Sequence, residues 1–351
     1  MTNRGEQKDV FCEIEFLKEY NQNMPKCIDP DNDTITRWID TYKFISRSNL
    51  HFNISLRDFN MLRKKDEYEY LARLWKKSTN GLCGLECDWD GLVQFQDTEL
   101  PNEKRYSSVY LLSKEHCDQM KIIAKAYGII VLDIGSLLNQ KMWFEVQQET
   151  IRKTKKTERI NWKHLEKSRH KCNSIAIVDG YLMKSEELIV NNLIPLLNVF
   201  LPSFLEDSLP FNISLITNCD KESDDEQAKE ELMIKYDLID SKLKEIRPHL
   251  KYTMGLFNMK GLFHDRHLLT NYAYVKSGAG FGLIVTDSKT GNPRFVNRTT
   301  VDTIFPFAVS DFSNAAYEYY SLCQDIKKIL LNEKGFIGVG ERHNRLFCQF
   351  D

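Results

Sequence analysis

The feature that most constrains the fold is a strand–helix–strand pattern in the first half of the chain. Ser108–Leu112 and Gly128–Asp133 carry runs of consecutive apolar residues, which are typical of buried strands. Between them, in Glu115–Tyr127, apolar residues recur at helical spacing. Because two strands joined by a crossover helix pair in parallel, the pattern predicts an α/β unit built on a parallel sheet.

The rest of this region fits the same unit. Val10–Cys12 begins an extended apolar stretch, and helical patterns follow at Thr34–Ser46 and Leu56–Lys77. We therefore expect a first α/β domain over residues 1–140.

A second α/β region with a mixed sheet is predicted over residues 173–351. Strand patterns lie at Ser174–Val178, Phe211–Thr217 and His249–Met254, and extended segments follow at Leu268–Tyr274 and Phe281–Thr286. Helical patterns cover Ser185–Phe200, Asp224–Glu245 and Asp311–Leu331.

The two regions are joined by a strongly basic segment, residues 141–172. Nine Lys and Arg lie between Arg152 and Lys171, against Glu158 and Glu166. Charge runs are usually solvated, which favours a basic helical linker. The alternative is a strip that binds phosphate groups.

Length and charge narrow the class of protein. The chain has 351 residues, with 48 Lys and Arg against 50 Asp and Glu, and a formal net charge of −2. This length suits two domains, and the composition excludes disordered, collagen-like and coiled-coil classes. Near-neutral charge excludes a broadly basic nucleic-acid coat but not a local phosphate pocket.

Cysteine usage and hydropathy indicate the cellular compartment in which we expect the protein. The nine cysteines are odd in number and mostly scattered, and we find neither a signal peptide nor a stretch long enough to span a bilayer. We expect a cytoplasmic protein with reduced thiols. Cys83 and Cys87 form the only close pair, and a zinc site there is the less favoured alternative.

The most specific motif lies between Phe263 and Phe281. His264 and Arg266 are two residues apart, so on a strand their side chains share one face. Lys276 follows, and Gly278 and Gly280 permit close approach of the backbone to a ligand. Together these residues predict an anion or phosphate site.

This segment resembles the phospholipase D signature, His-x-Lys-x4-Asp-x6-Gly-Ser-x-Asn. The spacings match at His264, Arg266, Asn271, Gly278, Ala279 and Phe281, although four of the residue types differ. A closer resemblance is to the MIT C-terminal domain, a phospholipase D-like module. It rests on His264-Asp265-Arg266, Asn271, Lys276, Gly278 and Gly280, and Thr299-Thr300-Val301-Asp302.

The resemblance implies a phospholipase D-like fold that binds anionic headgroups and pairs as a dimer. In active members of that superfamily two such motifs meet, one histidine attacking phosphorus and the other protonating the leaving group. Only one motif is present here, and Asn271 replaces a carboxylate. A degenerate anion-binding module, with His264, Arg266, Asn271, Lys276, Gly278 and Gly280 as its residues, is therefore favoured over a phosphodiesterase with His264 as nucleophile at a dimer interface.

Acidic residues of the first domain suggest a second site. Glu13 and Glu15 follow the apolar run at Val10–Cys12, Glu115 follows the strand that ends at Leu112, and Asp58 lies in a helical stretch. Carboxylates at the carboxyl ends of parallel strands can bind Mg²⁺ or Mn²⁺. The alternative is that they are ordinary surface charges at strand ends.

This distribution weakly resembles the PIN-like nucleases. Their Asp-Thr-Asn opening corresponds to Glu13, Ile14 and Glu15, and their late acidic residue corresponds to Glu115. The resemblance implies that Glu13, Glu15, Asp58 and Glu115 are catalytic, that Glu13, Glu15 and Glu115 hold the metal, and that two-metal hydrolysis is the mechanism.

Three functional hypotheses follow. The first is a metal-dependent nuclease effector, by analogy a defence protein, which cleaves RNA or DNA and carries a phospholipase D-like anion-binding and dimerisation domain. The second is a non-enzymatic dimer that binds anionic lipid at a membrane surface or a protein partner. The third is the phosphodiesterase based on His264.

Overall fold

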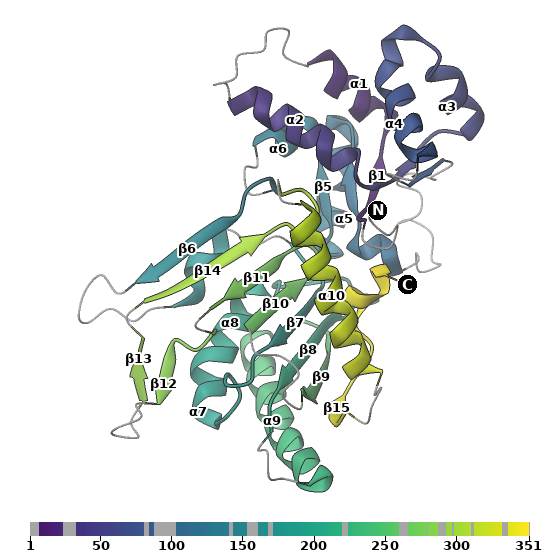
Figure 1. Cartoon of the computed structure of the whole chain (residues 1–351). Coiled ribbons are helices and arrows are strands. Elements are labelled where there is room, and N and C mark those ends of the chain that lie inside the picture. The colour runs from purple at the N-terminus through teal and green to yellow at the C-terminus, as the bar shows by residue number, and fades with distance from the viewer. Residues whose placement is uncertain are drawn as a thin grey trace. The chain divides into compact units, whose positions relative to one another are not determined.

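The chain folds into two compact units, both of the α/β class that the sequence predicts (Figure 1). Unit 1 comprises residues 1–145, 305–320 and 348–351, and unit 2 comprises residues 146–304 and 321–347. The computed structural model describes residues 7–23, 33–80, 84–87, 103–139, 143–152, 161–167, 171–219, 224–259, 266–278, 280–286, 293–296, 298–309, 312–331 and 336–350.

In unit 1, the described strands form a parallel sheet, sheet A, in the order β3-β2-β1-β4-β5. The strands are β1 (Asp9–Cys12), β2 (Asn49–Phe52), β3 (Leu85–Glu86), β4 (Val109–Leu111) and β5 (Ile130–Leu132). The chain runs outward from β1 to β3 and then returns past β1 to form β4 and β5. The winding direction therefore reverses between β1 and β4, which is where open α/β sheets usually bind ligands.

Helices connect these strands, as the apolar periodicity predicts. They are α1 (Ile14–Gln22), α2 (Asp33–Ile45), α3 (Leu56–Leu62), η2 (Asp66–Tyr68), α4 (Glu69–Thr79), η4 (Glu103–Ser107), α5 (Lys114–Ala126) and α6 (Ile134–Asn139). The predicted helix at Leu56–Lys77 is thus interrupted between α3 and α4.

Unit 2 contains a mixed sheet, sheet B, with the order β15-β9-β8-β7-β10-β11-β14-β6 in the described residues. Strands β7, β8 and β9 pair in parallel, and the other pairs are antiparallel. The strands are β6 (Gln147–Arg152), β7 (Ser174–Val178), β8 (Phe211–Thr217), β9 (Tyr252–Asn258), β10 (Arg266–Thr270), β11 (Tyr274–Ser277), β14 (Arg298–Ile304) and β15 (Gly338–Gly340), and β12 (Ile284–Thr286) pairs separately with β13 (Pro293–Phe295).

Buried apolar strands form the core of unit 2. Every residue of β7 and β8 is buried, as expected for central parallel strands. Helix α9 packs against β9 and β15. The described helices are η6 (Trp162–Lys167), α7 (Glu186–Leu188), the π-helix η7 (Ile189–Leu193), α8 (Ile194–Phe200), α9 (Asp225–Ile246), α10 (Phe312–Leu330) and η8 (Arg345–Phe350), of which the last two contain residues assigned to both units.

The basic linker requires a correction. Residues 147–152, which we expected to be helical, form strand β6 and pair with β14 at the end of sheet B. Most residues of Gln147–Arg152 are polar, so the segment lacks the alternation of apolar and polar residues that indicates a strand. It forms a strand because it pairs with β14. Residues 153–160 and 168–170 of the basic run lie outside the described residues.

The expected domain boundaries also differ from the observed units. Residues 305–320, which we expected in the C-terminal domain, belong to unit 1. No described helix is both long enough and apolar enough to cross a membrane.

Candidate functional site

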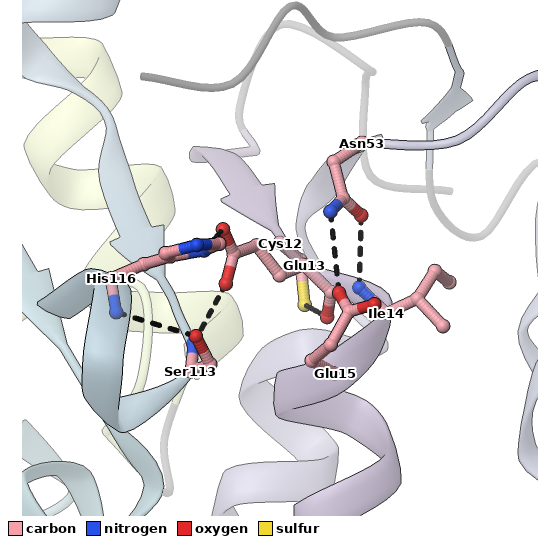
Figure 2. Close-up of polar contacts among 7 residues, drawn as sticks. All are labelled: Cys12, Glu13, Ile14, Glu15, Asn53, Ser113 and His116. Carbon is pink, nitrogen blue, oxygen red and sulfur yellow. Dashed lines mark hydrogen bonds and ion pairs between the residues drawn. The ribbon is translucent and has the colours of Figure 1, made fainter.

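The predicted acidic residue Glu13 lies where the winding of sheet A reverses. It follows β1 directly, and Ser113 and helix α5 follow the neighbouring strand β4. Since both strands end at the same edge, these residues meet there (Figure 2). Glu13 thus lies at the carboxyl end of a parallel strand, and its role as a metal ligand stays a prediction.

The carboxylate of Glu13 is buried and fully engaged. One oxygen, Oε2, accepts a hydrogen bond from the backbone N–H of Ser113 at 2.8 Å. The other, Oε1, lies 2.5 Å from Nδ1 of His116. Only 3 % of the Glu13 side chain is exposed, against 44 % of His116. Glu13 thus holds the start of α5 and orients an imidazole that faces solvent.

The neighbouring thiol of Cys12 is kept protonated. Burial raises its pKa well above the usual value, and the negative charges of Glu13 and Glu15 raise it further. A buried thiol of this kind is a poor nucleophile and a poor metal ligand. Cys12 is therefore part of the packing behind the Glu13–His116 pair rather than a reactive group.

The other predicted carboxylates serve local structure. Glu15 is exposed and accepts from Nδ2 of Asn53 at 3.3 Å, while Oδ1 of Asn53 accepts from the N–H of Ile14 at 3.0 Å (Figure 2). Asp58 is exposed, and its N–H and carboxylate both bond the hydroxyl of Ser55, which caps α3.

Glu115 is exposed in the first turn of α5. Among the described residues, no three His, Cys, Asp or Glu side chains gather closely enough to hold a metal ion. The structure therefore does not bring Glu13, Glu15, Asp58 and Glu115 together in one cluster, and metal binding by them stays a prediction.

A second concave site lies in unit 2, at the edge of sheet B where β7 ends. Strand β10 runs antiparallel to both β7 and β11, so Arg266 at its start lies beside Asp179 and the residues after Ser277. A cavity of about 290 Å³ opens there; it is lined by Asp179, Tyr181, Leu182, Lys184, Leu188, Asn192, Arg266, Gly280, Gly282 and Ile284.

Buried polar side chains fix the walls of this cavity. Asp179 accepts from the N–H groups of Tyr181 at 2.8 Å, Leu182 at 3.0 Å and Phe281 at 3.2 Å. Gly280 has a φ of +87°, and a Cβ there would lie 3.4 Å from Oδ2 of Asp179. Glycine is favoured at this position because of the left-handed backbone.

Positive charge gathers at one side of the cavity. The guanidinium of Arg266 lies 5.1 Å from the ring centroid of Tyr181, and the ammonium of Lys184 lies 4.5 Å from it. Tyr181 is 55 % exposed. Neither cation forms an ion pair with a carboxylate in the part of the chain that the structure describes.

The sequence-predicted anion site is rearranged in the structure. Arg266 and Gly280 do come together, since a Cβ on Gly280 would lie 3.6 Å from Nε of Arg266. Lys276 does not join them: it pairs with His267, whereas Arg266 pairs with Ser277. Because side chains alternate along a strand, Lys276 and Arg266 lie on opposite faces of sheet B.

The remaining predicted residues have other roles or lie outside the description. Asn271 is fully buried, and its Oδ1 accepts from the N–H of Asn173 at 3.2 Å, at the far end of β10 from Arg266. Gly278 is exposed with open space around it. His264 lies outside the described residues, as does Cys83.

Sequence reasoning missed Asp179, Tyr181, Lys184 and His116. An Asp-Gly pair directly after the buried strand Ser174–Val178 was the available signal for the turn at Asp179. His116 follows Ser113 by three residues at a helix start, but nothing local pointed to its pairing with Glu13, about a hundred residues away.

No protein-family model matches the chain, and no curated protein matches it.

Proposed function

We propose that unit 2 binds a phosphate-bearing ligand in the cavity beside Arg266. The observation that supports this most directly is the position of Arg266 and Lys184 near the ring of Tyr181, where neither has a carboxylate partner among the described residues. Two such cations at the mouth of a preformed cavity favour an anion that can accept several hydrogen bonds.

Charge and rigidity both support an anionic ligand. The described lining carries two positive side chains, Arg266 and Lys184, against the single carboxylate of Asp179. That carboxylate is already bonded by backbone N–H groups, which spread its negative charge. Because the walls are held by buried hydrogen bonds, little ordering is needed when the ligand binds.

The test is a calorimetric titration of the full-length protein with phenyl phosphate. We expect Arg266→Gln to weaken binding by about tenfold or more, because a charge-assisted bidentate pair is lost. Lys184→Gln should have a smaller effect, since its ammonium is more exposed. Lys276→Gln is the matched control and should leave binding unchanged, because Lys276 lies on the opposite face of sheet B.

Two outcomes would contradict the proposal: no binding of phenyl phosphate by the unaltered protein, or binding that depends on Lys276 and not on Arg266. Vesicles distinguish the source of the phosphate. Flotation with phosphatidylcholine vesicles that contain phosphatidic acid, lost in Arg266→Gln, would identify a lipid headgroup. Binding of phenyl phosphate without flotation would identify a soluble phosphate ester.

The nuclease hypothesis stays a prediction for unit 1, with Mg²⁺ or Mn²⁺ as its cofactor and RNA or DNA as its substrate. So do the homodimer, the cytoplasmic location and the phosphodiesterase role of His264. The position of Glu13 where the winding of sheet A reverses is the observation that favours a site in unit 1.

A further inference from the structure

We propose that Glu13 and His116 form a general acid–base pair in unit 1, with His116 the catalytic residue for hydrolysis of a phosphate ester and Glu13 its positioning residue. The proposal does not depend on ligand binding by unit 2. It rests on the orientation of one imidazole, its exposure, and its place in the sheet.

The orientation of His116 is fixed because both oxygens of the Glu13 carboxylate form hydrogen bonds. The Ser113 N–H holds Oε2 at 2.8 Å, which leaves Oε1 to accept from Nδ1 of His116 at 2.5 Å. A carboxylate at Nδ1 places the ring proton there, so Nε2 carries the lone pair of the neutral ring. No described residue bonds Nε2, and 44 % of the His116 side chain is exposed (Figure 2).

A second histidine in sheet A shows a different arrangement. Both ring nitrogens of His51 are occupied: Nε2 lies 3.0 Å from Oδ1 of Asp9, and Nδ1 lies 3.0 Å from Oε2 of Glu86. The ring also stacks on Phe11 with centroids 4.5 Å apart. His51 has no nitrogen left for proton transfer and is therefore a structural residue, unlike His116.

The position of His116 fits a reacting group. It lies in the first turn of α5, at the carboxyl ends of β1 and β4, the edge of the sheet where parallel α/β sheets bind ligands. The N–H groups at the start of α5 add partial positive charge at the end of the helix that carries the imidazole. This favours a substrate that carries negative charge at the reacting centre, such as a phosphate ester.

The reaction can be written with these groups alone. Nε2 of His116 takes a proton from a water molecule, whose oxygen forms a bond to phosphorus while the bond from phosphorus to the leaving oxygen breaks. The resulting imidazolium, held next to the negative charge of Glu13, gives the proton to the leaving oxygen. One water is consumed, and a phosphate ester becomes a phosphate and an alcohol.

The experiment measures hydrolysis by the full-length protein in EDTA, with p-nitrophenyl phosphate and bis-p-nitrophenyl phosphate as separate substrates. We expect release of nitrophenol from at least one of them, and the comparison tells a monoesterase from a diesterase. His116→Gln should lower the rate by about 100-fold or more, which is the usual contribution of a general base. His51→Gln is the matched control and should leave the rate unchanged.

Further readouts separate catalysis from a purely structural role. Added imidazole should restore part of the activity of His116→Ala. Glu13→Gln should lower the rate by about tenfold or more, provided that its circular dichroism shows a folded chain. Absence of hydrolysis of both esters, or full activity in His116→Gln, would overturn the proposal.

Discussion

At the scale of single residues, Asp240 in helix α9 shows how local hydrogen bonds change the pKa of a carboxyl group. Burial raises the pKa of its carboxyl, but hydrogen bonds from Lys244 at 2.6 Å and Tyr252 at 2.7 Å, with the Lys244 charge, outweigh burial and lower the pKa. A carboxyl whose pKa is lower in the folded state stabilises the fold above its unfolded pKa of about 3.9. That contribution is lost as the pH falls through the folded pKa.

We therefore predict that Asp240→Asn lowers the free energy of unfolding by about 1 kcal/mol at pH 7, since two hydrogen bonds to a charged acceptor are weakened. The difference from the unaltered protein should shrink below about pH 4 and vanish once both folded and unfolded carboxyls are protonated. Urea unfolding at pH 7, 5 and 3 checks this. Asp237→Asn, an exposed carboxylate on the same helix, is the control, and an equal loss there would contradict the assignment.

At the scale of elements, the π-helix η7 matters because it carries Asn192. This side chain is fully buried; its Oδ1 accepts from the N–H groups of Leu283 and Ile284, each at 2.8 Å, and its Nδ2 donates to the Ile284 carbonyl at 2.9 Å. One side chain thus holds the loop that forms a wall of the unit 2 cavity. π-Helical turns within helices are often found at functional sites.

Asn192→Ala should lower the free energy of unfolding by about 3 kcal/mol, because it leaves buried N–H groups without acceptors. It should also weaken phenyl phosphate binding at temperatures where the chain is still folded, since Ile284 lines the cavity. Urea unfolding and calorimetry measure the two effects. Asn191→Ala, an exposed neighbour in the same π-helix, should change neither, and a comparable loss there would contradict the role of Asn192.

Elements with a strong local pattern could be predicted from the sequence. The prediction of a strand, a helix and a second strand over Ser108–Asp133 was correct because the strands are wholly apolar and Ser113 caps the helix between them. The extended segment expected at Leu268–Tyr274 was correct only in part: its ends belong to β10 and β11, and a turn at residues 271–273 separates these strands. That turn contains no Gly or Pro and is held by Oγ1 of Thr270, which accepts from the N–H groups of Tyr272 and Ala273.

This turn also explains what the sequence could not predict about the cavity. Arg266 and Lys276 are an even number of residues apart, which on one continuous strand would place their side chains on the same face. The hairpin register instead places Lys276 opposite His267, and so on the face of sheet B that Arg266 does not share. The cationic partner of Arg266 is Lys184 instead, more than eighty residues earlier in the chain. Such pairings depend on strand order, which local patterns do not determine.

At the scale of the whole molecule, unit 1 needs residues far from its N-terminal part. Phe305 packs edge-on against Trp143, with ring centroids 4.1 Å apart, and against Phe44 at 5.9 Å. Phe307 continues this cluster and lies under the ammonium of Lys8 at 5.2 Å. Unit 1 is therefore completed only when the chain returns at residues 305–320.

We predict that a fragment of residues 1–145 lacks a cooperative thermal transition, because the apolar surface that faces Phe305 and Phe307 would be left open to water. In the full-length chain, Phe305→Ala should lower the stability of unit 1 by about 3–5 kcal/mol, the usual cost of removing a buried phenyl ring. Tyr317→Ala is the control, since Tyr317 is exposed in the same returning segment. Circular dichroism melting distinguishes the outcomes: a sharp transition in the 1–145 fragment, or an unchanged melt in Phe305→Ala, would show that the N-terminal part folds without the returning segment.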